Sequence, residues 1–259
     1  MKIFNHKITN FLKPLTFAMA FMALWLIPAC SHSISHAATA DPPAEQAEEP
    51  VEEADPAPAD VAEERPVGKI LFIGDSMTGW MAERLNAYGD ENGFEVATVV
   101  WDGSTLPKWG KAEGLVNIIE EQKPDAIMVS LGMNDMFESR PEARFGDDLQ
   151  AILNAFGDTP FLWVGPPSWP GHSEGEIFND WLAERLGPGN YFRSDRLSLN
   201  RQSKSNPHPT RDGIEKWIDE VVEWIPENAN FTLPGVTNPG EGKMTRGKTF
   251  IYKRMKENL

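Results

Sequence analysis

Residues 69–76 read Lys-Ile-Leu-Phe-Ile-Gly-Asp-Ser, and their pattern indicates the type of fold. Four consecutive apolar residues followed directly by a glycine are typical of a strand that is buried on both faces of a sheet. Residues 77–88 then have the spacing of a helix that ends near Gly89. A buried strand that leads straight into a helix predicts the first part of a βαβ unit.

The alternation of short apolar runs with amphipathic segments continues along the chain. We expect further strands at 94–100, 126–131, 160–164 and 191–192, and further helices at 112–122, 145–156, 176–186 and 211–224. Such alternation is typical of a parallel sheet between two layers of helices. We therefore predict an α/β fold, a three-layer α/β/α sandwich with a parallel flavodoxin-like sheet, over residues 67–230. Residues 231–259 have no readable periodicity and are expected to form a C-terminal extension.

The N-terminal residues have the pattern of an export signal. A basic stretch precedes the apolar run 15–27, which is shorter than the roughly 20 residues that a transmembrane helix needs. The segment that ends in Cys30 resembles a bacterial lipobox, so we expect a signal peptide over 1–29 and a lipid on Cys30. Residues 38–40, Ala-Thr-Ala, form a rival cleavage site. The lipobox interpretation predicts an exported cell-envelope lipoprotein, periplasm-facing or at the cell surface.

The residues after the signal are strongly acidic. Residues 41–66 carry ten acidic residues and one arginine among prolines and alanines, so we expect 30–66 to be a disordered, extended linker that holds a folded domain away from a membrane. The whole chain has a formal net charge of −15 and no basic stripe, which argues against nucleic acid as a partner. Its single cysteine excludes an intrachain disulfide. No cluster of His, Cys and carboxylates has ligand spacing, so we expect no metal and no cofactor.

Polar blocks follow the predicted strands, at the edge of the sheet where ligands bind. They are Gly-Asp-Ser at 74–76, Trp-Asp-Gly at 101–103, Gly-Met-Asn-Asp at 132–135, and Asn-Pro-His-Pro-Thr at 206–210 before the last helix. A serine needs a base to become a nucleophile, an imidazole can take its proton, and fixed N–H donors stabilise the oxyanion that forms. One serine, one histidine and such donors together predict acyl transfer.

With these blocks, the sequence resembles the SGNH (GDSL-like) hydrolase superfamily over about residues 68–225. The resemblance implies that Ser76 is the nucleophile and His208 the base. It also implies an oxyanion hole made by the backbone N–H groups of Ser76 and Gly103 and the side-chain amide of Asn134. Other interpretations stay open: Ser76 as a helix cap, Gly103 as a turn residue, and Asn134 with Asp135 as a turn pair. Tryptophans near the strand ends are candidates for core packing or for sugar stacking: Trp80, Trp101 and Trp169.

The sequence departs from the family pattern at one position. The family usually has an Asp three residues before the histidine, and here that residue is Ser205. Asp195, further upstream, is the candidate for a displaced acid, and a Ser–His dyad is the other arrangement. We predict a serine esterase that hydrolyses a small acyl ester, an acetyl group on a cell-envelope carbohydrate. Alternatives are an O-acyltransferase on the same scaffold and a non-catalytic envelope-binding lipoprotein with a degenerate site.

Overall fold

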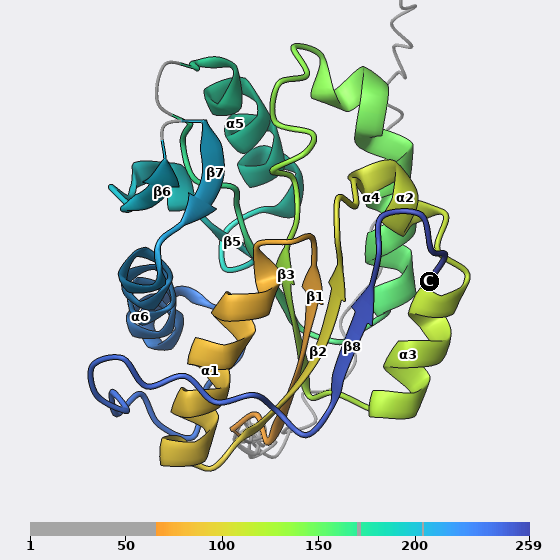
Figure 1. Cartoon of the computed structure of the whole chain (residues 1–259). Coiled ribbons are helices and arrows are strands. Elements are labelled where there is room, and N and C mark those ends of the chain that lie inside the picture. Colours follow the sequence, from red (N-terminus) through yellow and green to blue (C-terminus); the bar gives the residue numbers. More distant parts are fainter. Residues whose placement is uncertain (1–65, 170–171, 204) are drawn as a thin grey trace, which may run out of the picture. The chain divides into compact units, whose positions relative to one another are not determined.

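In the computed structural model the described residues are 66–169, 172–203 and 205–259. The predicted signal peptide, Cys30 and the acidic linker lie outside them. The described residues belong to one unit built on a six-stranded parallel sheet with the strand order β5-β4-β3-β1-β2-β8 (Figure 1). The strands are β1 (Lys69–Gly74), β2 (Glu95–Trp101), β3 (Ala126–Ser130), β4 (Phe161–Val164), β5 (Tyr191–Phe192) and β8 (Phe250–Lys253).

The first five strands have the order that defines a flavodoxin-like sheet, because the chain moves outward from β1 in both directions. The central strands are buried: residues 70–73 of β1 and all of β3 are at most 3% exposed. Strands that are buried on both faces must be covered by helices on both sides. The predicted α/β sandwich with a parallel sheet is therefore confirmed.

Two layers of helices cover the sheet (Figure 1). Helices α1 (Thr78–Asn92) and α6 (Arg211–Asn228) pack against each other on one face. The other face carries α3 (Gly114–Gln122), α4 (Pro141–Phe156) and α5 (Glu174–Leu186), with the short α2 (Leu106–Gly110) against α4. Helix α1 follows β1 and the turn that contains Ser76, and α6 follows the segment that contains His208. The two helices on one face therefore begin beside the two predicted catalytic residues.

Several boundaries differ from the sequence-based prediction for identifiable reasons. Helix α1 continues past Gly89 and ends at Gly93, whose φ of 84° is left-handed. Gly89 is needed inside the helix because a Cβ there would overlap the carbonyl of Phe94. Helix α4 begins earlier than expected, at Pro141, where the missing N–H of proline costs nothing. Residues that were expected to be a loop form a hairpin of β6 (Arg201–Ser203) and β7 (Asn206–Pro209), after the 3₁₀ turn η1 (Ser194–Arg196).

The segment 231–259, here called the C-terminal arm, is part of the same unit rather than an appendage. It crosses in front of α1, forms β8, the dark blue strand of Figure 1, and continues from there to the C-terminus. Strand β8 pairs with β2 in parallel, with Thr98 opposite Phe250 and Trp101 opposite Lys253. The sequence shows no sign of this strand, because its four residues stand alone in a polar segment.

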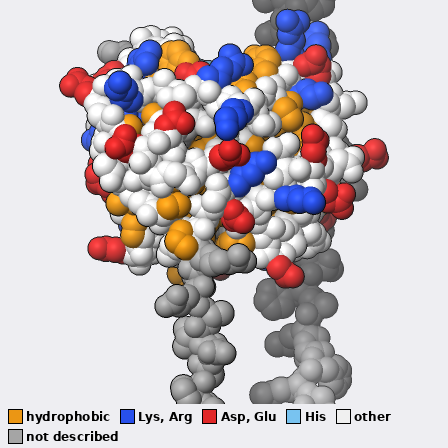
Figure 2. Space-filling model, turned by 90° about the horizontal axis from the view of Figure 1, so that it is seen from below, with side chains coloured by type: hydrophobic (Ala, Val, Ile, Leu, Met, Phe, Trp, Pro, Cys, Tyr) orange, Lys and Arg blue, Asp and Glu red, His pale blue; other side chains and the backbone are white. Residues whose placement is uncertain are grey.

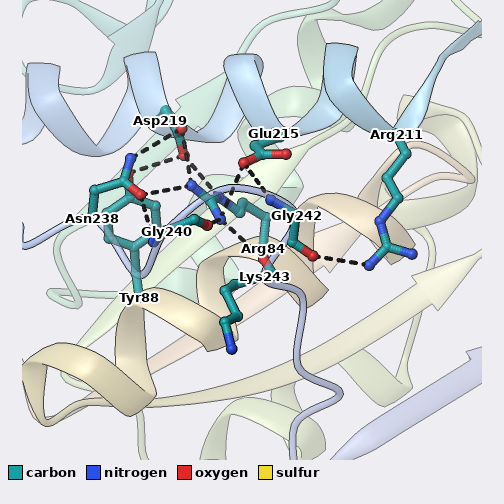
Figure 3. Close-up of polar contacts among 9 residues, drawn as sticks. All are labelled: Arg84, Tyr88, Arg211, Glu215, Asp219, Asn238, Gly240, Gly242 and Lys243. Carbon is teal, nitrogen blue, oxygen red and sulfur yellow. Dashed lines mark hydrogen bonds and ion pairs between the residues drawn. The ribbon is translucent and has the colours of Figure 1, made fainter.

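A buried arginine fixes the C-terminal arm to the helices (Figure 3). The side chain of Arg84, in α1, is fully buried and donates five hydrogen bonds. Two go to the carboxylate of Asp219 in α6, at 2.8 and 3.0 Å. Three go to the arm: to the carbonyls of Gly240 and Lys243, at 2.7 and 3.0 Å, and to Asn238 Oδ1, at 3.0 Å. Every donor of the guanidinium is therefore satisfied, as a buried charge requires.

Neighbouring groups complete this cluster. The Tyr88 hydroxyl donates to Asp219 Oδ1 at 2.9 Å and accepts from Asn238 Nδ2 at 3.0 Å. The backbone N–H of Gly242 donates to Glu215 Oε1 at 2.8 Å, and its carbonyl accepts from Arg211 at 3.1 Å (Figure 3). Residues of α1 and α6 thus hold the arm at several points before it turns towards β8.

The surface carries charges of both signs. On the face seen in Figure 2, basic and acidic side chains are interspersed with small groups of hydrophobic ones, and grey atoms cover part of the view. No helix in the described part of the chain is long and apolar enough to cross a membrane.

Candidate active site

The turn after β1 places Ser76 at the carboxyl edge of the sheet. Gly74 lies so close to β3 that a Cβ would overlap the carbonyl of Ser130. The backbone N–H of Asp75 donates to that same carbonyl at 3.0 Å. Asp75 Oδ1 in turn accepts the backbone N–H of Met77 at 2.9 Å. The Gly-Asp-Ser block is therefore a tight turn, held against β3, that presents Ser76 at the start of α1.

The structure brings Ser76 and His208 together across 132 residues of sequence. Ser76 Oγ lies 2.9 Å from His208 Nε2. On the other side of the ring, His208 Nδ1 lies 2.8 Å from Asn206 Oδ1, which also accepts the backbone N–H of His208 at 3.0 Å. The Asn206 amide is itself oriented, because its Nδ2 donates to Gln202 Oε1 at 2.9 Å. Nδ1 therefore carries the proton, and Nε2 is left to accept the hydroxyl proton of Ser76.

The structure does not bring Asp195 to the histidine. Its carboxylate accepts two hydrogen bonds from Arg193, at 2.8 and 2.6 Å, in a bidentate ion pair. The hydroxyl of Ser205 lies 3.4 Å from that of Ser203, on the exposed side of the hairpin. Asn206 thus occupies the place of the orienting acid, and sequence reasoning missed it. The only sign of it in the sequence is its position two residues before His208.

The two other predicted oxyanion donors lie in neighbouring loops. Asn134 Nδ2 donates to the carbonyl of Ser104 at 2.9 Å, which links the loop after β3 to the loop after β2 and leaves one amide hydrogen of Asn134 for another acceptor. Gly103 has a left-handed φ of 57°, and a Cβ there would lie 3.2 Å from Met255 Cγ and closer still to its Cε. Only glycine fits this turn beneath the C-terminal arm.

Two carboxyl groups are buried under the site. Burial raises the pKa of Asp75 to about 7, against the nearby backbone N–H groups of Met77, Met133 and Gly132, which lower it. Its Oδ2 has no hydrogen-bond partner within the described residues, which disfavours the charged form further. Burial likewise raises the pKa of Asp135 to about 7, although its carboxylate accepts the backbone N–H of Leu106 at 3.0 Å. Both groups connect strand-end loops rather than facing Ser76.

The imidazole of His208 is adapted to act as a base. Burial lowers its pKa below the ordinary value of 6.5, Asp102 opposes this effect, and Arg201 adds to it. Asp102 follows β2 and accepts a hydrogen bond from the hydroxyl of Tyr252 in β8. A lowered pKa keeps His208 neutral, and so able to accept a proton, at neutral and mildly acidic pH.

A pocket of about 330 Å³ opens beside Ser76 and His208. Its polar lining includes Glu83, Asp102 and Arg246. Its wall is mainly apolar and aromatic, formed by Met77, Trp80, Val100, Ile214, Phe250 and Tyr252. Two of these side chains come from β8, so the C-terminal arm supplies part of the candidate active site. Sequence reasoning missed this contribution, because it depends on a strand that the sequence does not reveal.

The three tryptophans have different environments. Trp101 is buried and packs edge-on against Trp109 at a centroid distance of 5.6 Å, as core packing predicts. Trp169 is partly buried beside Phe137 and His172. Trp80 is 47% exposed and lines the pocket next to Ser76. Of the three, Trp80 is the one that faces the site.

Within residues 66–169, 172–203 and 205–259, no group of three or more His, Cys, Asp or Glu side chains is arranged to hold a metal ion.

The chain matches no protein-family model and no curated protein. Among solved structures it is similar to a lipolytic protein of the G-D-S-L family from Desulfitobacterium hafniense DCB-2 (14% identity, 60% of this chain and 97% of that chain, TM-score 0.46). It is also similar to a Clostridium thermocellum family 3 carbohydrate esterase (15%, 61% and 94%, 0.48). A third is the Enterococcus faecalis lipase/acylhydrolase (19%, 62% and 96%, 0.41).

Proposed function

We propose that the protein is a serine esterase that works through an acyl-enzyme on Ser76. The observation that carries the proposal is the chain of hydrogen bonds from Ser76 through His208 to Asn206, at 2.9 and 2.8 Å. A serine held on a base whose other nitrogen is fixed is the arrangement that activates a hydroxyl for attack. A neutral amide takes the orienting role in the Cys-His-Asn proteases, so an asparagine suits this position.

The mechanism follows from the atoms in place. His208 Nε2 takes the proton of Ser76 Oγ as that oxygen attacks the ester carbonyl, and a tetrahedral oxyanion forms. The donors that we assign to this oxyanion are the backbone N–H groups of Ser76 and Gly103 and the free amide hydrogen of Asn134. The bond to the alcohol then breaks, and His208 returns its proton to the alcohol oxygen. In the second half of the reaction, His208 takes a proton from water as its oxygen attacks the acyl-enzyme. The bond to Ser76 Oγ then breaks, Ser76 regains its proton from His208, and the acid is released.

The substrate that we propose is a small acyl ester, an acetyl group carried by a cell-envelope carbohydrate. The proposed location, on a lipid attached to Cys30 with the acidic linker as a spacer, supports this substrate class. Mass spectrometry of the mature protein tests the location: residue 30 is expected at the N-terminus, carrying acyl chains. A mature chain that starts at Asp41 would instead show cleavage after Ala38-Thr39-Ala40.

Hydrolysis of p-nitrophenyl acetate tests the activity. The Ser76→Ala variant is expected to lose turnover and labelling by a fluorophosphonate probe, while its circular dichroism stays that of the wild type. Ser205→Ala is the matched control, because this hydroxyl is exposed and contacts Ser203 rather than His208. If Ser76→Ala is labelled as strongly as the wild type, Ser76 is not the nucleophile and the proposal fails. A wild-type protein that neither hydrolyses the ester nor reacts with the probe would favour the non-catalytic alternative.

A further inference from the structure

The volume of the pocket beside Ser76 is larger than an acetyl group requires. Ligand pockets of about 300 Å³ and above hold most of a small molecule, with apolar walls and a few polar groups that orient it. The pocket here has about 330 Å³, an aromatic wall and three charged side chains, Glu83, Asp102 and Arg246. It therefore has room for a second part of the substrate besides the acetyl group.

The position of the pocket indicates whether it holds the acyl part or the alcohol part of the ester. Ser76 and His208 both line it, whereas the assigned oxyanion donors Gly103 and Asn134 are not among its lining residues. In acyl transfer the carbonyl oxygen turns towards the oxyanion donors, and the leaving oxygen must reach the imidazole that protonates it. The alcohol part of the ester is thus directed to the side of His208, where the pocket lies.

Two flat side chains form the open part of the wall. Trp80 of α1 and Tyr252 of β8 are 47% and 50% exposed, although both are large and apolar. Both line the pocket. The hydroxyl of Tyr252 donates a hydrogen bond to Asp102, which fixes the orientation of the ring. The guanidinium of Arg246 lies 4.0 Å from the ring centroid of Phe250, in the same strand. Exposed aromatic faces in a pocket offer stacking surface for a planar or ring-shaped ligand.

The arm that carries Tyr252 is held rigidly. Arg84 binds it to α1 and α6 through three bonds to Asn238, Gly240 and Lys243 (Figure 3). The backbone N–H of Thr245 then donates to the carbonyl of Glu83 at 2.8 Å, directly before Arg246 reaches the pocket. A wall fixed in this way costs little entropy when a ligand binds.

We propose that Trp80 and Tyr252 form a binding site for the alcohol part of the ester, and that this site selects ring-shaped alcohols with an apolar face. The proposal rests on the proposed esterase function. In the step that uses the site, Ser76 Oγ bonds to the acyl carbon, the bond from that carbon to the ring alcohol breaks, and the alcohol oxygen takes the proton from His208. The ring alcohol then leaves the pocket.

Two acetates that differ only in their alcohol test the site. 2-Naphthyl acetate and vinyl acetate give the same acetyl-enzyme, so their kcat/KM values differ only through the alcohol. The ratio of the two values is measured for each variant, and it cancels the concentration of active enzyme. Comparing the ratio of a variant with that of the wild type also cancels the difference in intrinsic reactivity between the two esters. Trp80→Ala and Tyr252→Ala are each expected to lower the ratio by about three- to tenfold, the effect of losing one aromatic stacking partner.

Two controls separate the ring from its surroundings. Tyr252→Phe keeps the ring and is expected to keep the wild-type ratio within about twofold. Lys253→Ala changes the next residue of β8, which is not a lining residue, and is expected to leave both substrates unaffected.

The possible failures can be told apart. If vinyl acetate is hydrolysed only when Ser76 is present, but the ratio is unmoved in Trp80→Ala and Tyr252→Ala, the alcohol site is refuted and the esterase stands. If these variants instead change the preference between p-nitrophenyl acetate and p-nitrophenyl hexanoate, the pocket holds the acyl part and the proposal is wrong. If Ser76→Ala hydrolyses both acetates like the wild type, the esterase and its alcohol site fall together.

Discussion

Asn206 Oδ1 lies 2.8 Å from His208 Nδ1, and the two residues are only two positions apart in the hairpin that precedes α6. The bond is local, so it forms whenever β7 forms. It fixes the imidazole without bringing a negative charge to it. A carboxylate in this place would stabilise the imidazolium, whereas an amide orients the ring and leaves its pKa to burial and to more distant charges.

Substitutions of Asn206 separate orientation from charge. Asn206→Ala is expected to lower kcat by about 10- to 100-fold, because the ring loses its fixed tautomer and position. Asn206→Asp keeps an acceptor at this position and adds a negative charge, so the pKa of His208 should rise. The pH profiles of kcat/KM check both. An unchanged kcat in Asn206→Ala would show that the hydrogen bond has no part in activity.

The acid limb of the pH profile reports on His208. Because burial lowers the pKa of this group, half-maximal kcat/KM is expected below pH 6.5. Asp102 raises the pKa, so Asp102→Asn should move the midpoint to still lower pH. A midpoint that moves to higher pH in this variant contradicts the sign of the interaction. Glu138→Gln, in the loop after β3, is the control: it removes a carboxylate charge that does not affect the pKa of His208.

The side-chain amide of Asn134 is expected to act on the transition state. Its orientation is fixed by the Ser104 carbonyl, so its second hydrogen is directed before the substrate arrives. Asn134→Ala should lower kcat by about 10²–10³ with little change in KM. Steady-state kinetics with p-nitrophenyl acetate decide the point, and a change confined to KM would make Asn134 a substrate-binding residue.

The buried carboxyl of Asp135 makes stability depend on pH. Its pKa is raised from 3.8 to about 7 on folding, so the folded protein binds the proton more tightly than the unfolded chain. The contribution to the free energy of unfolding is therefore present below about pH 4 and is lost as the pH rises towards 7. Asp135→Asn cannot lose a proton, so its stability relative to the wild type should increase between pH 4 and pH 8. Urea unfolding at several pH values measures this, and a relative stability that falls over the same range would contradict it.

Arg84 and Arg211 form a matched pair, because both donate to carbonyls of the C-terminal arm. Arg84 is buried and Arg211 is exposed. Arg84→Met leaves Asp219 without its guanidinium partner and should cost about 3–5 kcal/mol of unfolding free energy. Arg211→Met should cost at most about 1 kcal/mol. Equal losses in the two variants would show that the buried cluster contributes no more than a surface contact.

The sequence predicts those parts of the molecule that depend on local pattern. Continuous apolar runs predict β1 to β4, and the blocks after them place Ser76 and the loops of Gly103 and Asn134 at one edge of the sheet. The hydrogen bond between Asn206 and His208 cannot be predicted from such a pattern, because it depends on the geometry of a hairpin whose sequence is polar. Asp195 was a reasonable candidate by charge, but Arg193 lies two residues away and pairs with it.

Tertiary contacts decide the remaining differences. In the sequence Gly89 indicates the end of a helix, whereas in the structure its missing side chain allows the carbonyl of Phe94 to lie close to the helix. Strand β8 is four residues long, and its pairing with β2 is decided by the anchoring of the arm at Arg84 rather than by its own sequence. A contact between residues 156 positions apart leaves no periodic signal.

The late position of β8 in the chain has a consequence for how the protein matures. Until residues 250–253 have been synthesised and have paired with β2, this strand has an exposed edge. The unpaired backbone groups of such an edge can bind strands of other chains. The same four residues close this edge and bring Phe250 and Tyr252 to the pocket. A chain that is cut short before β8 therefore lacks part of its pocket and exposes the unpaired edge of β2. The pairing of residues 250–253 thus protects the sheet and completes the pocket in the same step.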